Sequence, residues 1–186
     1  MKNLCIFASG SGSNFSAIAD NAQNGILPAN VDLLVCDNPT AKVLAKAENF
    51  GIPSFSFYPK NYSTKAAYES EILRELNRRN IDFIALAGYM RLIGPTLLNP
   101  FKGRIVNIHP SLLPSFPGRN AVGQALAYGV KVTGVTVHYV DEGIDTGEIL
   151  AQKSVAIEPF DTEYTISAKI HAVEHELYTK VLREIL

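Results

Sequence analysis

The chain has 186 residues, of which 47% are hydrophobic and 19% are charged, and its formal net charge is −1. This length suffices for one domain with a full hydrophobic core, so we expect a single domain over residues 1–186. Nucleic-acid-binding domains usually carry an excess of basic residues, whereas this chain has 17 Lys and Arg and 18 Asp and Glu. We therefore expect no nucleic-acid partner.

The N-terminal residues do not resemble a targeting or membrane segment. The apolar run before Ser9 is too short for a signal sequence. No apolar run approaches the ~18 residues of a membrane-spanning helix. We expect a cytoplasmic protein without membrane contact, in which Cys5 and Cys36, both inside apolar runs, are buried and unpaired.

Apolar strands and amphipathic helices alternate along the first half of the chain. The expected strands cover residues 3–8, 31–36, 54–57 and 82–87. One helix is expected after Ser13, a second over residues 41–50 with Thr40 as its N-cap, and a third over residues 64–79, which Thr64 opens. Strand–helix alternation predicts a parallel sheet with right-handed crossovers.

The second half departs from this alternation. A strand at 105–109 and a helix at 121–128 precede an alternating apolar–polar run at 133–139, which is typical of an antiparallel strand. A partner strand is expected at 149–157 and a long helix at 162–186, with Thr162 near its N-cap. We expect an α/β fold: one Rossmann-like, mostly parallel sheet flanked by helices, with an antiparallel C-terminal portion and a long C-terminal helix.

A glycine- and serine-rich loop, Gly10-Ser11-Gly12-Ser13-Asn14, joins the first strand to the first helix. Backbone N–H groups in such a loop, together with the helix N-terminus, favour an anion. Phe15 stands where a dinucleotide-binding fingerprint needs a third glycine, and the Lys of a Walker loop is missing. Two interpretations stay open: a tight turn with a capping serine, or a phosphate monoester site.

Three polar residues far apart in the sequence suggest acyl-transfer chemistry. Asn107 and His109 share one side of a strand that Pro110 ends, and Asp145 lies in a glycine-rich loop. An amide and an imidazole can donate hydrogen bonds to a tetrahedral oxyanion, and a carboxylate can orient the imidazole. A structural histidine and a turn aspartate are the simpler interpretation of each residue taken alone.

Other catalytic classes lack support in the sequence. No Ser or Cys stands in a nucleophile-elbow motif, so a covalent acyl-enzyme is not expected. The four histidines (109, 138, 171 and 175) show no metal-binding spacing such as H-E-x-x-H, and we expect no metal.

In order along the chain, these motifs resemble those of the glycinamide ribonucleotide formyltransferases, folate-dependent enzymes of purine biosynthesis. The resemblance extends over nearly the whole chain. The matching stretches are Ala8–Asn14, Leu86–Arg91, Asn107–Pro114, Gly134–His138 and Asp145–Gly147. The Asn-x-His-Pro-Ser-Leu-Leu-Pro signature is shared by transferases and hydrolases of 10-formyltetrahydrofolate, so it identifies the chemistry and not the acceptor.

The resemblance implies a role for each matching residue. Asn107, His109 and Asp145 match the catalytic residues, and 10-formyltetrahydrofolate is the implied co-substrate. Gly12, Ser13, Asn14 and Glu174 match positions at the phosphate and ribose of the acceptor. Lys65, Met90, Arg91, Leu92, Ile93 and Asn107 match positions around the folate.

The implied reaction is direct formyl transfer to glycinamide ribonucleotide by a monomer or homodimer with small-molecule substrates only. Methionyl-tRNA formyltransferases carry an additional C-terminal barrel and formyltetrahydrofolate hydrolases an N-terminal regulatory domain, and neither is expected within residues 1–186. Two alternatives stay open: a phosphosugar- or nucleotide-binding regulatory module that lacks catalysis, and formyl transfer to an amino sugar nucleotide.

Overall fold

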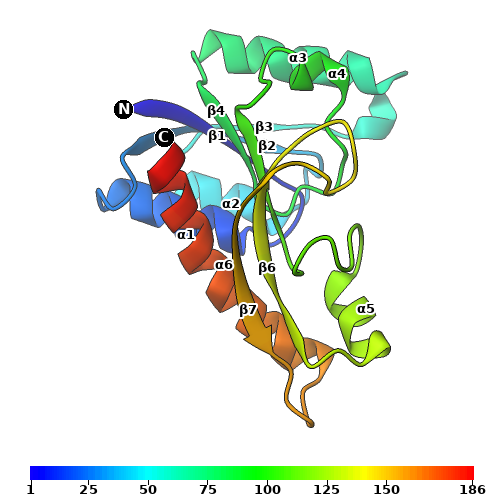
Figure 1. Ribbon diagram of the computed structural model, residues 1–186. Coiled ribbons are helices and arrows are strands. Elements are labelled where there is room, and N and C mark those ends of the chain that lie inside the picture. Colours follow the sequence, from blue (N-terminus) through cyan, green and yellow to red (C-terminus); the bar gives the residue numbers. More distant parts are fainter.

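Seven strands form one sheet in the order β3-β2-β1-β4-β5-β6-β7 (Figure 1). The computed structural model describes all residues 1–186. The strands are β1 (Lys2–Ala8), β2 (Ala29–Cys36), β3 (Ser54–Ser56), β4 (Phe83–Leu86), β5 (Ile105–His109), β6 (Val132–Tyr139) and β7 (Ile149–Ala156). The first five pair in parallel, whereas β6 and β7 pair antiparallel with their neighbours. The predicted mixed sheet is confirmed.

Six α-helices and one 3₁₀ turn connect these strands. They are α1 (Ser13–Gln23), α2 (Lys42–Asn49), the 3₁₀ turn (Pro59–Asn61), α3 (Lys65–Arg78), α4 (Pro95–Leu98), α5 (Ala121–Tyr128) and α6 (Glu163–Ile185). The N-cap expected near Thr162 is confirmed, and Thr64 caps α3, because each hydroxyl accepts a backbone N–H three residues later. The cap expected at Thr40 is wrong: its hydroxyl donates to Asn38 Oδ1, and Ala41 precedes the helix.

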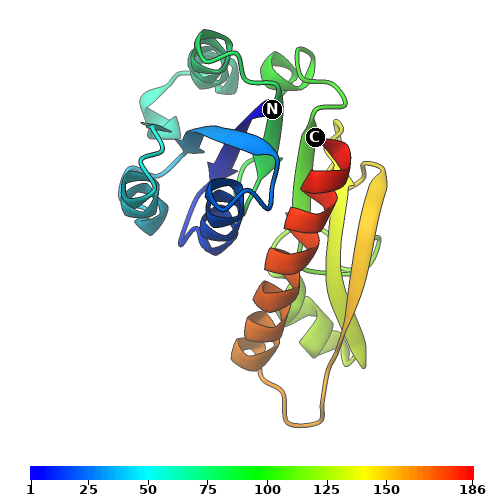
Figure 2. The same cartoon turned by 90° about the vertical axis from the view of Figure 1, so that its left-hand side faces the viewer.

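The sheet is covered on both faces. Helices α1, α2 and α6 pack on one face and α3 and α4 on the other, as the two views show (Figure 2). Strand β1 alternates between the two cores: Leu4 and Ile6 belong to one, and Cys5 and Phe7 to the other. Because the sheet is buried on both faces, the sequences of its strands are nearly continuous runs of apolar residues. Both cysteines are buried and unpaired, as predicted.

The strand order reverses between β1 and β4, and the carboxyl ends of the strands open into a crevice there. The buried hydroxyl of Tyr178, on α6, lies 2.9 Å from the carbonyl oxygen of Leu86 and 3.2 Å from that of Val106. This hydroxyl therefore links β4 to β5 near the carboxyl ends of the two strands, next to the crevice. No helix is long and apolar enough to cross a membrane.

Candidate active site

A cavity of about 1110 Å³ occupies the crevice at the carboxyl ends of β1, β4 and β5. Its walls come from the loop after β1, the segment after β4, the end of β5, the loop after β6 and the helix α6. Every site residue predicted from the sequence lines it except Lys65. Such a cavity is large enough for two small-molecule substrates side by side.

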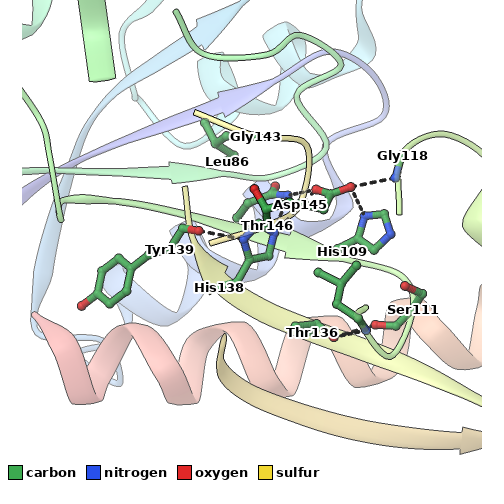
Figure 3. Close-up of polar contacts among 12 residues, drawn as sticks. Leu86, His109, Ser111, Gly118, Thr136, His138, Tyr139, Gly143, Asp145 and Thr146 are labelled. Carbon is green, nitrogen blue, oxygen red and sulfur yellow. Dashed lines mark hydrogen bonds and ion pairs between the residues drawn. The ribbon is translucent and has the colours of Figure 1, made fainter. Parts of the chain in front are cut away.

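Asn107, His109 and Asp145 meet at the centre of this cavity. One carboxylate oxygen of Asp145, Oδ2, lies 3.4 Å from Nδ1 of His109 (Figure 3). The other, Oδ1, lies 3.4 Å from Nδ2 of Asn107. The imidazole of His109 is buried, whereas Asn107 is half-buried. The carboxylate of Asp145 thus contacts both the amide of Asn107 and the imidazole of His109, although Asp145 lies 36 residues after His109.

The carboxylate of Asp145 is held ionised by its surroundings. Burial opposes ionisation, but the hydrogen bond with His138, the backbone N–H of Gly118 and the neighbouring His109 outweigh it and lower the pKa of Asp145. The Gly118 N–H donates to Oδ2 over 2.8 Å. Asp145 itself adopts a left-handed backbone conformation, with φ of 54°, which is unusual for a residue with a side chain.

Both ring nitrogens of His109 face oxygen acceptors. Nε2 lies 2.9 Å from the carbonyl oxygen of Phe116, and Nδ1 faces Asp145. Since a carbonyl only accepts, Nε2 carries a proton, and an imidazolium satisfies both contacts. A substrate carbonyl would take the place of Phe116 as the acceptor for Nε2, and the ring would then donate to a developing oxyanion.

His138 completes this cluster, although its sequence context predicted no role for it. Its Nε2 lies 3.3 Å from Nδ2 of Asn107 and 3.6 Å from Oδ1 of Asp145, while Nδ1 donates to the carbonyl of Tyr139 (Figure 3). His138 is directly opposite Asn107 in the antiparallel β5–β6 pair. The pairing of these two strands is the signal that could have identified His138, because residues opposite one another in a sheet share a face.

The glycine- and serine-rich loop forms a second polar region of the cavity. Gly12 has a φ of 72°, and an added Cβ would overlap the side chain of Val43, so the loop needs glycine there. Helix α1 begins at Ser13, and its first N–H groups are free to bind an anion.

Asn14 and Glu174 link this loop to α6. Nδ2 of Asn14 donates to Oε2 of Glu174 over 3.0 Å, and the Oδ1 atom of Asn14 is buried without a partner. Burial raises the pKa of Glu174, against the opposing effects of Asn14 and His171. His171 is exposed at the rim of the cavity. Together these groups offer donors and acceptors to a phosphorylated sugar.

The segment after β4 forms the opposite wall. Met90 and Leu92 are 61% and 51% exposed and line the cavity together, whereas Ile93 is buried. Nε of Arg91 donates to Asp37 over 2.7 Å. Lys65 lies behind this wall, where its Nζ donates to the carbonyl of Leu92 over 2.9 Å. The exposed apolar side chains suit a flat, largely apolar ligand.

No group of three or more His, Cys, Asp or Glu side chains is arranged to hold a metal ion. Asp145 contacts both His109 and His138, and the other nitrogen of each ring lies against a backbone carbonyl oxygen, of Phe116 and Tyr139 respectively. The cluster is therefore arranged for hydrogen bonding and proton movement.

Residues 2–182 match the family model described as "Formyl transferase". The chain is 55% identical to phosphoribosylglycinamide formyltransferase of Bacillus subtilis (strain 168), an alignment that covers all of this chain and 95% of that relative. It is 39% identical to the trifunctional purine biosynthetic protein adenosine-3 of Drosophila melanogaster over 97% of this chain, which spans 14% of that protein.

Solved structures share the whole fold. The crystal structure of glycinamide ribonucleotide transformylase 1 from Geobacillus kaustophilus superposes with a TM-score of 0.98 at 62% identity, covering 100% of this chain and 99% of the other. The structure of phosphoribosylglycinamide formyltransferase from Bacillus halodurans gives 0.97 at 55% identity, covering 100% and 95%.

Proposed function

The chain belongs to the formyl transferase family, and we propose that it transfers the formyl group of 10-formyltetrahydrofolate to the amine of glycinamide ribonucleotide. The observation that carries this proposal is the contact of Asn107, His109 and Asp145 beside the loop that contains Ser13 and Asn14. Acyl transfer needs oxyanion donors and a route for a proton, and a phosphorylated acceptor needs an anion site. One cavity supplies both.

In the proposed reaction the amine attacks the formyl carbon, and the carbonyl oxygen becomes an oxyanion. Asn107 and His109 donate hydrogen bonds to this oxygen, and Asp145 holds the imidazolium of His109 in place. The tetrahedral intermediate collapses as the bond between the formyl carbon and N10 breaks. The amine loses one proton and N10 gains one, and the carboxylate of Asp145 lies where it can relay that proton through a water molecule.

We place the phosphate of the acceptor at the start of α1, against the backbone of Gly12 and the side chains of Ser13 and Asn14. Glu174 would then accept hydrogen bonds from the ribose hydroxyls. The partial positive charge at the N-terminus of α1 favours binding of the phosphate, and the buried carboxylate of Glu174 favours uncharged hydrogen-bond donors such as the ribose hydroxyls. This placement brings the amine end of the ribonucleotide toward His109.

We place the formyl-folate against the wall formed by Met90, Arg91, Leu92 and Ile93, with Asn107 at its formyl end. Lys65 holds this wall by its contact with the carbonyl of Leu92 and adds positive charge near the folate tail. All of these residues come from one chain, so a monomer or a homodimer can carry out the reaction.

The test is a transfer assay with 10-formyltetrahydrofolate as the donor and a panel of acceptors. The panel contains glycinamide ribonucleotide, its dephosphorylated form and an amino sugar nucleotide. We expect formylation of glycinamide ribonucleotide and little turnover of the dephosphorylated form. Preferential formylation of the amino sugar nucleotide, or binding of the ribonucleotide without any transfer, would refute the proposed function.

A further inference from the structure

Arg91 separates two cavities. It lines the large cavity and also a smaller one of about 420 Å³, which lies beside the ends of β1 and β2. Asp37 and Lys60 border the smaller cavity from the other side. The guanidinium is therefore the only cationic group that belongs to both walls, and its position affects the shape and charge of the large cavity.

Asp37 is a buried carboxylate whose one side-chain hydrogen bond goes to Arg91. It directly follows β2 and is 8% exposed. Its Oδ2 accepts from Nε of Arg91 over 2.7 Å, and its Oδ1 is buried without any partner. Burying a charged group costs free energy unless it is paired, so a carboxylate at this place needs the arginine.

The backbone on both sides of Arg91 is held by other contacts. The Met90 N–H donates to the hydroxyl of Ser9 over 2.9 Å, and the Gly94 N–H donates to Oε1 of Glu69 over 2.6 Å. Asp37 is thus not needed to fix the path of the chain. What it fixes is the side chain of Arg91, which is 41% exposed and has the hydroxyl of Tyr68 as its other hydrogen-bonding neighbour.

We propose that Asp37 is a positioning residue for the formyl-folate: it holds the guanidinium of Arg91 at the wall of the large cavity, where that guanidinium would bind a carboxylate of the folate tail. The hydrogen bond from Arg91 to Asp37 uses Nε, so the outer Nη groups can bind a carboxylate. This inference rests on the proposed function and adds a residue outside the large cavity to the co-substrate site.

Charge alone predicts the opposite effect of losing Asp37. A carboxylate near an anionic ligand repels it, so its neutralisation would tighten folate binding if Asp37 acted only through its charge. Loss of positioning weakens folate binding instead, because the guanidinium must then be ordered by the ligand itself. The direction of the change therefore distinguishes the two explanations.

The test compares Asp37→Asn with the wild type in two measurements. Equilibrium titration with tetrahydrofolate requires no turnover, and we expect its Kd to rise roughly three- to tenfold. In the transfer assay the KM for 10-formyltetrahydrofolate should rise to a similar extent, while kcat and the KM for the ribonucleotide stay within about twofold. Asp20→Asn, an exposed charge change on α1, is the matched control and should leave every value unchanged.

Two further variants show whether Asp37 acts through Arg91. Asp37→Asn combined with Arg91→Ala should bind tetrahydrofolate no more weakly than Arg91→Ala alone. Asp37→Glu keeps the carboxylate and should recover part of the affinity if Asp37→Asn proves unstable. A donor without the glutamate tail, 10-formyltetrahydropteroate, should show no effect of Asp37→Asn.

An unchanged or lower Kd for tetrahydrofolate in Asp37→Asn would overturn the inference, as would additive losses in the double variant. An equal rise in KM for both substrates would show a general structural role and would also overturn it. Absence of formyl transfer by the wild type would refute the proposed function separately, since the titration measures the folate site without turnover.

Discussion

Asn107 and His138 face each other across β5 and β6, with Nδ2 of Asn107 3.3 Å from Nε2 of His138. The other ring nitrogen of His138 donates to the carbonyl of Tyr139, and its Nε2 faces both the amide of Asn107 and the carboxylate of Asp145. His138 therefore fixes the amide of Asn107 with its nitrogen toward Asp145. The amide of Asn107 is thus oriented by a residue that does not itself belong to the proposed catalytic trio.

Replacement of His138 by Phe keeps the bulk of the ring and removes both ring nitrogens, and with them the contact with Asn107. We expect kcat to fall roughly tenfold, because Asn107 loses one of the two contacts that orient it, while KM for both substrates changes little. Steady-state kinetics with each substrate varied in turn checks this. An unchanged kcat in a folded His138→Phe enzyme would show that Asn107 is oriented without it.

Gly147 lies where no side chain fits. A Cβ at this position would overlap the carbonyl oxygen of Tyr139, which is the acceptor for Nδ1 of His138. Gly147→Ala should therefore displace the loop that carries Asp145 and lower kcat by about tenfold or more.

Gly25 is the control for this prediction. It has a φ of 73° but open space around it, and it lies away from the cavity. Gly25→Ala should lose stability through backbone strain, by about 1 kcal/mol, and keep full activity. Equal activity of the two variants would contradict the steric argument for Gly147.

Glu174→Gln should separate stability from substrate binding. Burial raises the pKa of Glu174 in the folded protein above its value in the unfolded chain. As the pH rises between these two pKa values, the carboxyl group is ionised in the unfolded chain but still protonated in the folded protein, so the free energy of unfolding falls. The glutamine keeps an acceptor for Asn14 and removes the buried charge, so the variant should be more stable than the wild type at neutral pH. Its KM for the ribonucleotide should rise roughly tenfold through weaker ribose contacts.

Thermal denaturation between pH 4 and 8 and ribonucleotide kinetics check both parts. A variant that is less stable at neutral pH and unchanged in KM would contradict this account of Glu174.

Asp161 is expected to contribute acid-sensitive stability at the start of α6. Hydrogen bonds from Lys169, from the Glu158 N–H and from Thr165 lower its pKa to about 2. Since the folded pKa lies below the ordinary value of 3.8, the contribution is fully present above pH 3.8 and is lost as the pH falls through about 2. Asp161→Asn should be less stable than the wild type at neutral pH, and the two should converge in acid.

Urea denaturation at a series of pH values between 2 and 7 measures this difference. Formyl transfer should be unaffected, because Asp161 does not line the cavity. A stability difference that stayed constant down to pH 2 would exclude the ionised carboxylate as its source.

The sequence pattern predicted the sheet because its strands are buried on both faces and its helices have clear apolar stripes. It did not predict α4, since four residues beginning at Pro95 are too short to show helical periodicity. Thr40 was wrongly expected to cap α2, because the hydroxyl found a nearer partner in the side chain of Asn38. Local competition of this kind cannot be read from residue type alone.

Some residues of the site could likewise be predicted from the sequence, and others could not. Asn107, His109 and Asp145 were identified because they lie in motifs at the ends of strands or in a glycine-rich loop. His138 and Asp37 were not, because their roles depend on contacts between distant segments: the register of β5 with β6, and the approach of Arg91 to the end of β2.

The most direct test of the central claim is the single-turnover rate of formyl transfer from 10-formyltetrahydrofolate to glycinamide ribonucleotide in the wild type, Asn107→Ala and His109→Ala. Loss of one oxyanion donor typically costs ~10²–10³ in rate, and we predict a loss of that size in each variant with its fold intact. A purified, folded His109→Ala protein that transfers formyl within about threefold of the wild-type rate would contradict the account.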